Sequence, residues 1–128
     1  MKVKVLNAFS LSMLDCESAV HLRIELVPLE IALRIASEEQ LESFIGHEST
    51  AKIVSKMLGV DLSVRRESVK LSRNEAVLVA QYCGPRLPEG CTELPSGAEI
   101  RFFLVMEETN SVLYGEMLQS FAAPSSAE

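Results

Sequence analysis

Hydrophobic and polar positions alternate in two stretches near the start of the chain, and this pattern predicts two strands. Residues 2–6 alternate lysines with apolar side chains, and residues 19–27 show the same two-residue period of a half-buried strand. In the second stretch the apolar face consists of Val20, Leu22, Ile24 and Leu26. His21 belongs to the polar face, where we expect an exposed side chain without a special role. Residues 7–14 have no clear period and favour a loop with a helical turn.

Apolar residues three and four positions apart predict helices in the next part of the chain. Pro28 suits the first position of a helix, and helical spacing continues through Leu29, Ala32, Leu33 and Ala36. Ser37 begins an S-x-x-Q capping pattern, so either a second short helix runs to residue 44 or 45, or the first helix continues with a kink. A better delimited helix lies within residues 45–59, where Gly59 suits the helix end. Its apolar face consists of Ala51, Val54 and Leu58, with Ile53 and Met57 beside them.

The second half of the chain predicts two buried strands and a more polar one. Residues 76–83 are almost continuously apolar, as expected for a central strand covered on both faces, and residues 100–106 resemble them. Residues 66–71 are a further strand candidate, whose polar face carries Arg66, Ser68 and Lys70. Turns or loops are predicted at residues 72–75, 84–90, 92–97 and 109–111. Residues 112–121 form either an edge strand or a terminal helix, and residues 122–128 form a frayed tail.

These elements predict a single α/β domain over residues 1–121, with a mixed sheet of about five strands flanked by helices and a flexible tail after it. A chain of 128 residues buries about two-thirds of its unfolded surface, so it needs no disulfide or metal to fold. Its three cysteines, Cys16, Cys83 and Cys91, lack C-x-x-C spacing, and neither histidine lies at a zinc-ligand interval from a pair of them. We therefore expect reduced thiols, a cytoplasmic location, no metal site and no cofactor.

Charge and hydropathy argue against two broad classes of protein. The formal net charge of −6 does not suit a surface for duplex nucleic acid, because such affinity comes from clustered Lys and Arg. No stretch approaches the about 20 apolar residues of a membrane span. The apolar run at the start is interrupted by Asn7, Ser10 and Ser12, unlike a secretory signal. A small anionic ligand in a local basic pocket remains compatible with this composition.

The clearest candidate site is the start of the helix predicted within residues 45–59. Gly46 lets a ligand approach the main chain, Ser49 and Thr50 are capping-type residues with hydroxyls, and free N–H groups at a helix start suit a phosphate. His47, in the same place, is a side chain that exchanges protons near neutral pH. The alternative is a capping box whose histidine only hydrogen-bonds to nearby backbone.

Three other places carry candidate chemistry, each with a structural alternative. Gln81 is polar within a buried strand, so it either closes a core network or faces a ligand near the strand end. Arg86 and Glu89 lie in a loop made rigid by prolines and glycines, and they either act at a site or form an exposed ion pair. Arg66 and Lys70 form either an anion-binding patch or a solvated strand edge.

Four separated blocks of sequence are more informative together than any one of them. They are Leu6–Ser10, Ile45–Ala51, Arg66 with Val69–Leu71, and Arg86–Gly90. In this order and spacing the chain resembles the viral and bacterial ring nucleases of the anti-CRISPR type, a family first met as small proteins of archaeal viruses. The resemblance covers roughly residues 2 to 107 and leaves out the segment that follows. It departs at residues 92–97, where a shorter, loop-like stretch replaces an expected helix.

The resemblance implies a homodimer that binds cyclic tetra-adenylate across its two-fold axis. Such an enzyme cuts the ring without metal into linear di-adenylates with 2′,3′-cyclic phosphate ends, and so switches off type III CRISPR signalling. By the same resemblance His47 is the catalytic histidine, and Arg86 and Glu89 lie near the reacting phosphodiester. The implied substrate-binding residues are Arg66, Asn7, Ser10, Gly46 and Gln81, to which the helix start adds Ser49 and Thr50. The alternative function is a non-catalytic dimeric sink or regulator that binds a cyclic nucleotide.

Overall fold

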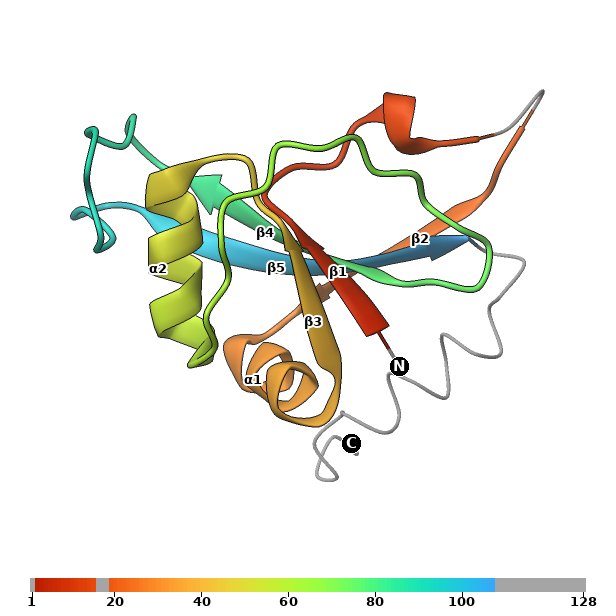
Figure 1. Ribbon diagram of the computed structural model, residues 1–128, viewed down its shortest axis with the longest axis horizontal. Coiled ribbons are helices and arrows are strands. Elements are labelled where there is room, and N and C mark those ends of the chain that lie inside the picture. Colours follow the sequence, from red (N-terminus) through yellow and green to blue (C-terminus); the bar gives the residue numbers. More distant parts are fainter. Residues whose placement is uncertain (1, 16–18, 108–128) are drawn as a thin grey trace.

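A five-stranded mixed sheet forms the centre of the single α/β domain, and the computed structural model describes residues 2–15 and 19–107 (Figure 1). The strands are β1 (Lys2–Leu6), β2 (Leu22–Val27), β3 (Gln40–Phe44), β4 (Val77–Cys83) and β5 (Glu99–Glu107). The helices are the 3-10 turn η1 (Leu11–Met13), α1 (Leu29–Glu38) and α2 (Glu48–Leu58). The strand order is β2-β5-β4-β1-β3; β1 is parallel to β3 and β4, and β5 is antiparallel to β2 and β4.

Most of the predicted elements are confirmed. The alternating and the continuously apolar stretches became β1, β2, β4 and β5, and the apolar run of β4 lies at the middle of the sheet, as expected for a strand buried on both faces. The two amphipathic helices became α1 and α2, and Gly59 ends α2 in the left-handed conformation with φ 71°. His21 is exposed, as predicted.

The two faces of the sheet are covered differently. On one face, α1 and α2 lie side by side and bury β1 and β4 residues such as Val3, Val5 and Leu78 (Figure 1). On the other face the cover is irregular chain: Val69 and Leu71 pack on Leu6, Val77, Val79 and Val105, together with side chains of the loop after β1. The core therefore has a helical layer and a loop layer, separated by the sheet.

The helix predicted from Ser37 to residue 44 or 45 is wrong, and so is its alternative of a kinked α1. Residues 40–44 form β3, which pairs in parallel with β1 from Lys2↔Gln40 to Leu6↔Phe44. The S-x-x-Q pattern describes only local capping, whereas five residue pairs along β1 supply a full hydrogen-bond ladder. Pro28 is also one position earlier than predicted, since it is the N-cap of α1.

The strand predicted at residues 66–71 is also wrong. This segment is irregular, and only Val64, just before it, makes an isolated parallel bridge with Ile45. The alternation itself is real, because Val69 and Leu71 are buried while Lys70 is exposed. Leu71 donates its backbone N–H to the carbonyl of Met13 at 2.8 Å, so this chain segment packs on the sheet without joining its ladder.

The apolar face of β2 is not buried as predicted. Ile24 and Leu26 are 55% and 59% exposed, although their neighbour Val27 lies in the core. The two-residue period therefore predicted the strand, but not the burial of its apolar face, because the described chain does not cover these side chains.

Some predictions fall on residues outside the described ranges. These are the predictions for the turn at residues 109–111, the element at residues 112–121, the tail at 122–128 and Cys16. Cys83 and Cys91 are free thiols, half-buried. Across residues 2–15 and 19–107, neither α helix has the length and hydrophobicity that crossing a membrane requires.

Candidate functional site

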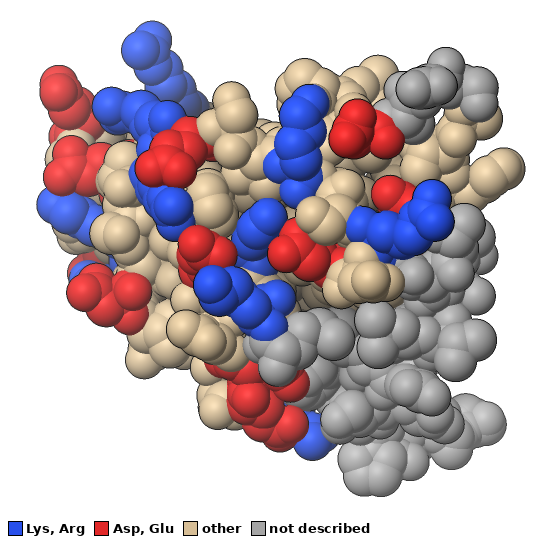
Figure 2. All heavy atoms as spheres, turned by 45° about the vertical axis from the view of Figure 1, so that its right-hand side comes forward, with Lys and Arg blue, Asp and Glu red and all other residues tan. Residues whose placement is uncertain are grey.

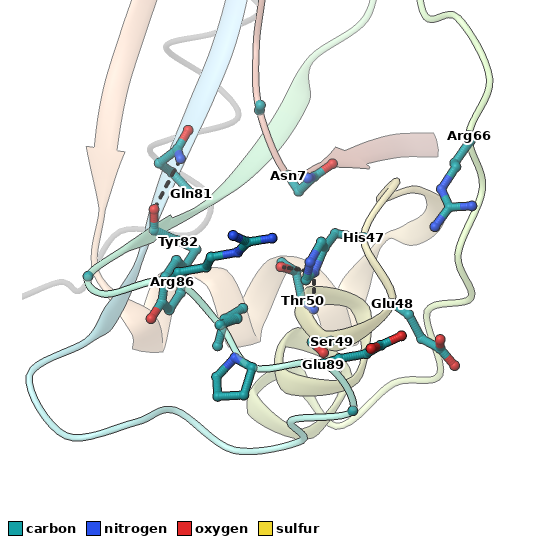
Figure 3. Close-up of a pocket in the computed structure, with 15 residues that line it drawn as sticks. Asn7, His47, Glu48, Ser49, Thr50, Arg66, Gln81, Tyr82, Arg86 and Glu89 are labelled. Atoms are coloured by element: carbon teal, nitrogen blue, oxygen red, sulfur yellow. Dashed lines mark hydrogen bonds between the residues drawn. The ribbon is translucent and has the colours of Figure 1, made fainter.

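An open pocket of about 990 Å³ lies at one edge of the sheet (Figure 3). Its walls include most of the candidate residues from the sequence: Asn7, His47, Ser49, Thr50, Arg66, Gln81, Arg86 and Glu89. These residues are widely separated along the chain. The topology brings them together because β1, β3 and β4 are parallel. The segments that follow β1 and β3 therefore meet the end of β4 on the side of the sheet where the carboxyl ends of these strands lie.

His47 is the N-cap of α2 and also faces the pocket. Its Nδ1 accepts a hydrogen bond from the backbone N–H of Thr50 at 3.3 Å, and the Thr50 hydroxyl lies 3.1 Å from the same nitrogen (Figure 3). The structural interpretation of this histidine is confirmed, since it caps the helix. It is also an exposed residue of the pocket wall, where its catalytic role stays a prediction. With Nδ1 as the acceptor, the neutral ring carries its proton on Nε2.

Ser49 and Thr50 differ from the cap predicted for them. Both are only 4% exposed and lie inside the first turn of α2, because His47 takes the N-cap position instead. They still line the pocket. Nothing in the residue types at 47–50 favours histidine over serine or threonine as the cap, so the sequence could not assign it.

Gly46 is held by two of the predicted ligand-binding residues. Its backbone N–H donates to Asn7 Oδ1 at 3.0 Å, and its carbonyl accepts from Arg66 Nε at 2.8 Å. A Cβ on Gly46 would lie 3.6 Å from Arg66 Cγ, an ordinary contact, so the glycine is not required by crowding in this state. Asn7 and Arg66 thus hold the two peptide groups on either side of the Gly46 Cα, directly before His47.

The segment that carries Arg66 is itself anchored to β3. The Arg65 backbone N–H donates to the Ile45 carbonyl at 2.9 Å, and Arg65 Nη1 donates to Glu42 Oε2 at 2.9 Å. The Arg65 guanidinium lies 4.3 Å from the centre of the Phe44 ring. The hydrogen bond from Arg65, followed by the nearby positive charge of Lys2, lowers the pKa of the Glu42 carboxyl below its ordinary value.

Arg86 and Glu89 enter the pocket from the loop after β4. The guanidinium of Arg86 extends toward His47 (Figure 3). In the described part of the chain, Arg86 and Glu89 form no ion pair with each other, so the structural alternative for this pair does not apply. The loop is positioned by the Tyr82 hydroxyl, which donates to the Pro85 carbonyl.

Gln81 and Ser10 have different outcomes. Gln81 is half-buried, donates from Nε2 to the Tyr82 carbonyl at 3.1 Å and lines the pocket near the end of β4. Ser10 is exposed, pairs with the Ser12 hydroxyl at 2.8 Å and does not line the pocket in this structure. Gly46 is adjacent to the pocket wall through Arg66 and His47, without lining it itself.

Sequence reasoning missed several residues of the pocket wall. They are Ala8, Glu48, Tyr82, Gly84, Leu87, Pro88 and Gly90. Tyr82 and Leu87 are half-buried and add aromatic and aliphatic surface to an otherwise polar wall. Only their positions in the sequence could have identified these two residues as part of the pocket. Tyr82 follows Gln81 at the strand end, and Leu87 lies between Arg86 and Glu89.

The charges of the pocket are local and mixed. It contains the guanidinium groups of Arg66 and Arg86 and the carboxylates of Glu48 and Glu89. Figure 2 shows basic and acidic side chains interspersed over one face of the molecule, without a single large basic surface. Among the residues described, no three or more His, Cys, Asp and Glu side chains are grouped to hold a metal ion.

Comparison with known proteins adds a family and a solved structure. The sequence model of the STIV B116-like family matches residues 3–102, a range that contains every residue of the pocket wall. The fold is similar to B116 of Sulfolobus turreted icosahedral virus (STIV), with a TM-score of 0.66 and 28% sequence identity over 83% of this chain and 99% of that chain. No protein with a curated description matches the chain.

Proposed function

The chain belongs to the STIV B116-like family, and from its pocket and its sequence resemblance to ring nucleases we propose that it is a metal-independent ring nuclease. The proposed reaction cuts cyclic tetra-adenylate into linear di-adenylates with 2′,3′-cyclic phosphate ends. In the cytoplasm of a cell with type III CRISPR defence, or of an infected host, this reaction would switch off the signal. The proposal rests above all on one observation: His47, Arg66, Arg86 and Glu89, far apart in sequence, line one pocket.

The chemistry requires an RNA-type sugar, because the ribose 2′-hydroxyl attacks the neighbouring phosphorus in line. The protein then has three tasks: to hold that geometry, to stabilise the charge on the phosphorus, and to protonate the departing 5′ oxygen. His47 is the proposed proton donor. Arg86 is the proposed contact for the charged phosphate, and Glu89 either orients a cationic group or helps to activate the 2′-hydroxyl.

The helix start contributes fewer main-chain donors than a free helix end. The N–H of Gly46 is bonded to Asn7 and that of Thr50 to His47. Within the described structure this leaves the N–H groups of Glu48 and Ser49 for an anion. Arg66 uses only Nε for the Gly46 carbonyl, so its two terminal nitrogens complete the proposed phosphate site.

The bases need surface as well as charge. Tyr82 and Leu87 lie on the pocket wall and are half-buried, so each offers an apolar face that is already positioned. Adenine rings stack on such faces in single-stranded RNA recognition. We assign them the adenine contacts of the ring.

The proposal includes a homodimer. A cyclic ligand with two-fold symmetry fits two identical pockets related by a two-fold axis, and would be cut at two opposite linkages. Exposed Ile24 and Leu26 on β2 support a partner, since large apolar side chains at an open strand edge favour association.

A dimeric sink or regulator is the second candidate, and one observation favours it. His47 has a structural task as the cap of α2, and that task needs no proton transfer. A binding protein would therefore also need this histidine.

One pair of variants separates catalysis from capping. His47→Ala removes both the proton donor and the cap, whereas His47→Asn removes the donor but keeps a side chain that caps helices well. With cyclic tetra-adenylate in single-turnover reactions followed by chromatography, we expect both variants to lose more than about 10²-fold in rate and to keep their binding. Only His47→Ala should lose stability, by about 1 kcal/mol.

The outcomes are distinct. Full cleavage by His47→Asn would show that capping, not proton donation, is the role of this histidine. A wild-type protein that binds the ring and returns it intact would be the sink. The same reaction in excess EDTA should proceed at the full rate, and a strict need for added divalent metal would overturn the metal-free scheme.

A further inference from the structure

Thr50 lies directly beside His47, the proposed proton donor. Its side chain is only 4% exposed, and its hydroxyl lies 3.1 Å from His47 Nδ1. We propose that Thr50 is a positioning residue. Its hydroxyl accepts a hydrogen bond from Nδ1–H when His47 is charged, and so makes the imidazolium possible at this helix start. This inference rests on the proposed ring-nuclease function and concerns the same site.

The backbone alone supports only the neutral ring. The Thr50 N–H points its hydrogen at Nδ1, 3.3 Å away, so Nδ1 must offer a lone pair and Nε2 must carry the proton. A proton added at Nδ1 would face the hydrogen of that N–H. Without another acceptor, the charged ring would have to leave its place.

The hydroxyl solves this problem because it works in both directions. A threonine hydroxyl has one hydrogen to donate and two lone pairs that accept, and it rotates freely between these roles. Next to the neutral ring it donates to Nδ1 or turns away, and next to the imidazolium it accepts the new Nδ1–H. Nε2 then keeps its proton in both states.

The proton balance of the proposed step uses the same contact. In the form of the scheme in which Glu89 activates the 2′-hydroxyl, the 2′-oxygen bonds to phosphorus and gives its proton to the Glu89 carboxylate, while the bond from phosphorus to the 5′ oxygen breaks. The 5′ oxygen keeps the electron pair and takes the Nε2 proton. His47 is left neutral, with its remaining proton on Nδ1. The Thr50 N–H disfavours this tautomer because its own hydrogen points at Nδ1, whereas the Thr50 hydroxyl stabilises it by accepting a hydrogen bond from Nδ1–H.

Other charged groups share the pocket. Arg66 comes from the segment after the Val64 bridge, Arg86 and Glu89 from the loop after β4, and Glu48 from α2 itself. Substitution at Thr50 leaves all of them in place, so a difference between Thr50 variants reports on the hydroxyl.

The first measurement needs no ligand. The chain has two histidines, so ¹⁵N-detected NMR of the ring nitrogens resolves His47, with exposed His21 as the internal reference. In the wild type we expect Nε2 protonated in the neutral ring. Thr50→Val, which keeps the shape and removes the hydroxyl, should lower the midpoint of the His47 titration, whereas Thr50→Ser should leave it at its wild-type position.

The second measurement is the pH dependence of single-turnover ring cleavage. An acid that must be protonated loses activity as pH rises, so the basic limb of the profile should move to lower pH in Thr50→Val. At pH 7, with the protein in saturating excess over the ring, the rate should fall about tenfold. Thr50→Ser should follow the wild type. Ile53→Val, a truncation of a buried α2 residue outside the pocket wall, controls for a general effect on the helix.

The two levels of inference fail separately. An unchanged His47 titration and an unchanged profile in a folded Thr50→Val would overturn the role of Thr50, whatever the function of the protein. A wild type that never cleaves the ring would overturn the ring-nuclease proposal, and the NMR titration would still decide whether Thr50 controls His47. Should Thr50→Val fail to fold, Thr50→Ala decides by the same two readouts.

Discussion

Single polar residues serve both the fold and the pocket in this protein. Asn7 and Arg66 each use one atom to hold a peptide group beside the Gly46 Cα, and His47 uses Nδ1 to cap α2. Each of these side chains has at least one further polar atom and lines the pocket. This double use explains why residue types alone left a structural and a functional interpretation open for His47: its capping role is confirmed, and its role in the pocket stays a prediction.

Arg66 offers a test of this double use. A guanidinium can donate from Nε to the Gly46 carbonyl and from its terminal nitrogens to a phosphate at once, while a lysine has one nitrogen for both tasks. We therefore expect Arg66→Lys to bind cyclic tetra-adenylate about tenfold or more weakly, nearly as weakly as Arg66→Ala, by isothermal titration calorimetry. Arg101→Lys, at an exposed arginine outside the pocket wall, is the control. Wild-type affinity in Arg66→Lys would show that charge alone suffices.

Candidate pocket residues could be predicted from the sequence where their residue type is unusual for the surrounding segment. Gln81 stood out as a polar side chain in an apolar strand, and Arg86 and Glu89 stood out in a loop of prolines and glycines. Tyr82 and Leu87 did not, because aromatic and aliphatic side chains near a strand end are ordinary core residues. Ser10 was expected beside the ligand, but its placement depends on the loop after β1, whose path no local pattern encodes.

At the scale of elements, the site depends on where the segments after β1, β3 and β4 meet. The sequence predicted β1 and β4 because their apolar patterns persist over several residues. It failed at β3, since residues 40–44 have no alternation of their own and become a strand only by pairing with β1. It failed again at residues 66–71, where alternation reflects packing of irregular chain on the sheet. Long-range pairing decided both cases.

The loop after β4 is the element most open to a test, because Gly84 lets it cross close to the chain before β5. A Cβ on Gly84 would lie 2.7 Å from Ala98 Cβ and 2.8 Å from Ala98 Cα, and φ is 149°. Gly84→Ala must therefore displace the loop that carries Arg86 and Glu89. We expect cleavage of the ring to fall by about 10²-fold while α2 and the sheet stay folded.

Gly97→Ala is the matched control for that substitution. Gly97 also has positive φ, 84°, but a Cβ there meets nothing within 4 Å. Both variants should lower the Tm, because the positive φ costs each about 1 kcal/mol or more of stability, and Gly84→Ala should lower it further through the clash with Ala98. Only Gly84→Ala should lose activity in addition. Equal losses of activity in the two variants would mean that the close crossing at Ala98 does not position the pocket.

At the scale of the whole molecule, the edge of the sheet that β2 forms matters, because the described chain leaves apolar side chains exposed there. The order β2-β5-β4-β1-β3 leaves β2 at one edge, and there Ile24 and Leu26 are more than half exposed. Ile24 and Leu26 lie two residues apart on the same face of β2, and exposed apolar side chains in this arrangement favour association with another subunit. A subunit contact there would complete the burial that the two-residue period of β2 predicted.

The last prediction therefore concerns the assembly. We expect the wild type to sediment as a dimer at micromolar concentration, and Ile24→Lys with Leu26→Lys to sediment as a folded monomer, because four lysines would oppose one another across a two-fold contact. If the ring is held by two pockets, the monomer should also bind cyclic tetra-adenylate at least about tenfold more weakly. Leu33→Lys, at a partly exposed leucine of α1, tests whether any added charge has this effect. A wild type that is monomeric and fully active would remove the dimer from the mechanism, and a double-lysine variant that stays dimeric would move the subunit contact away from β2.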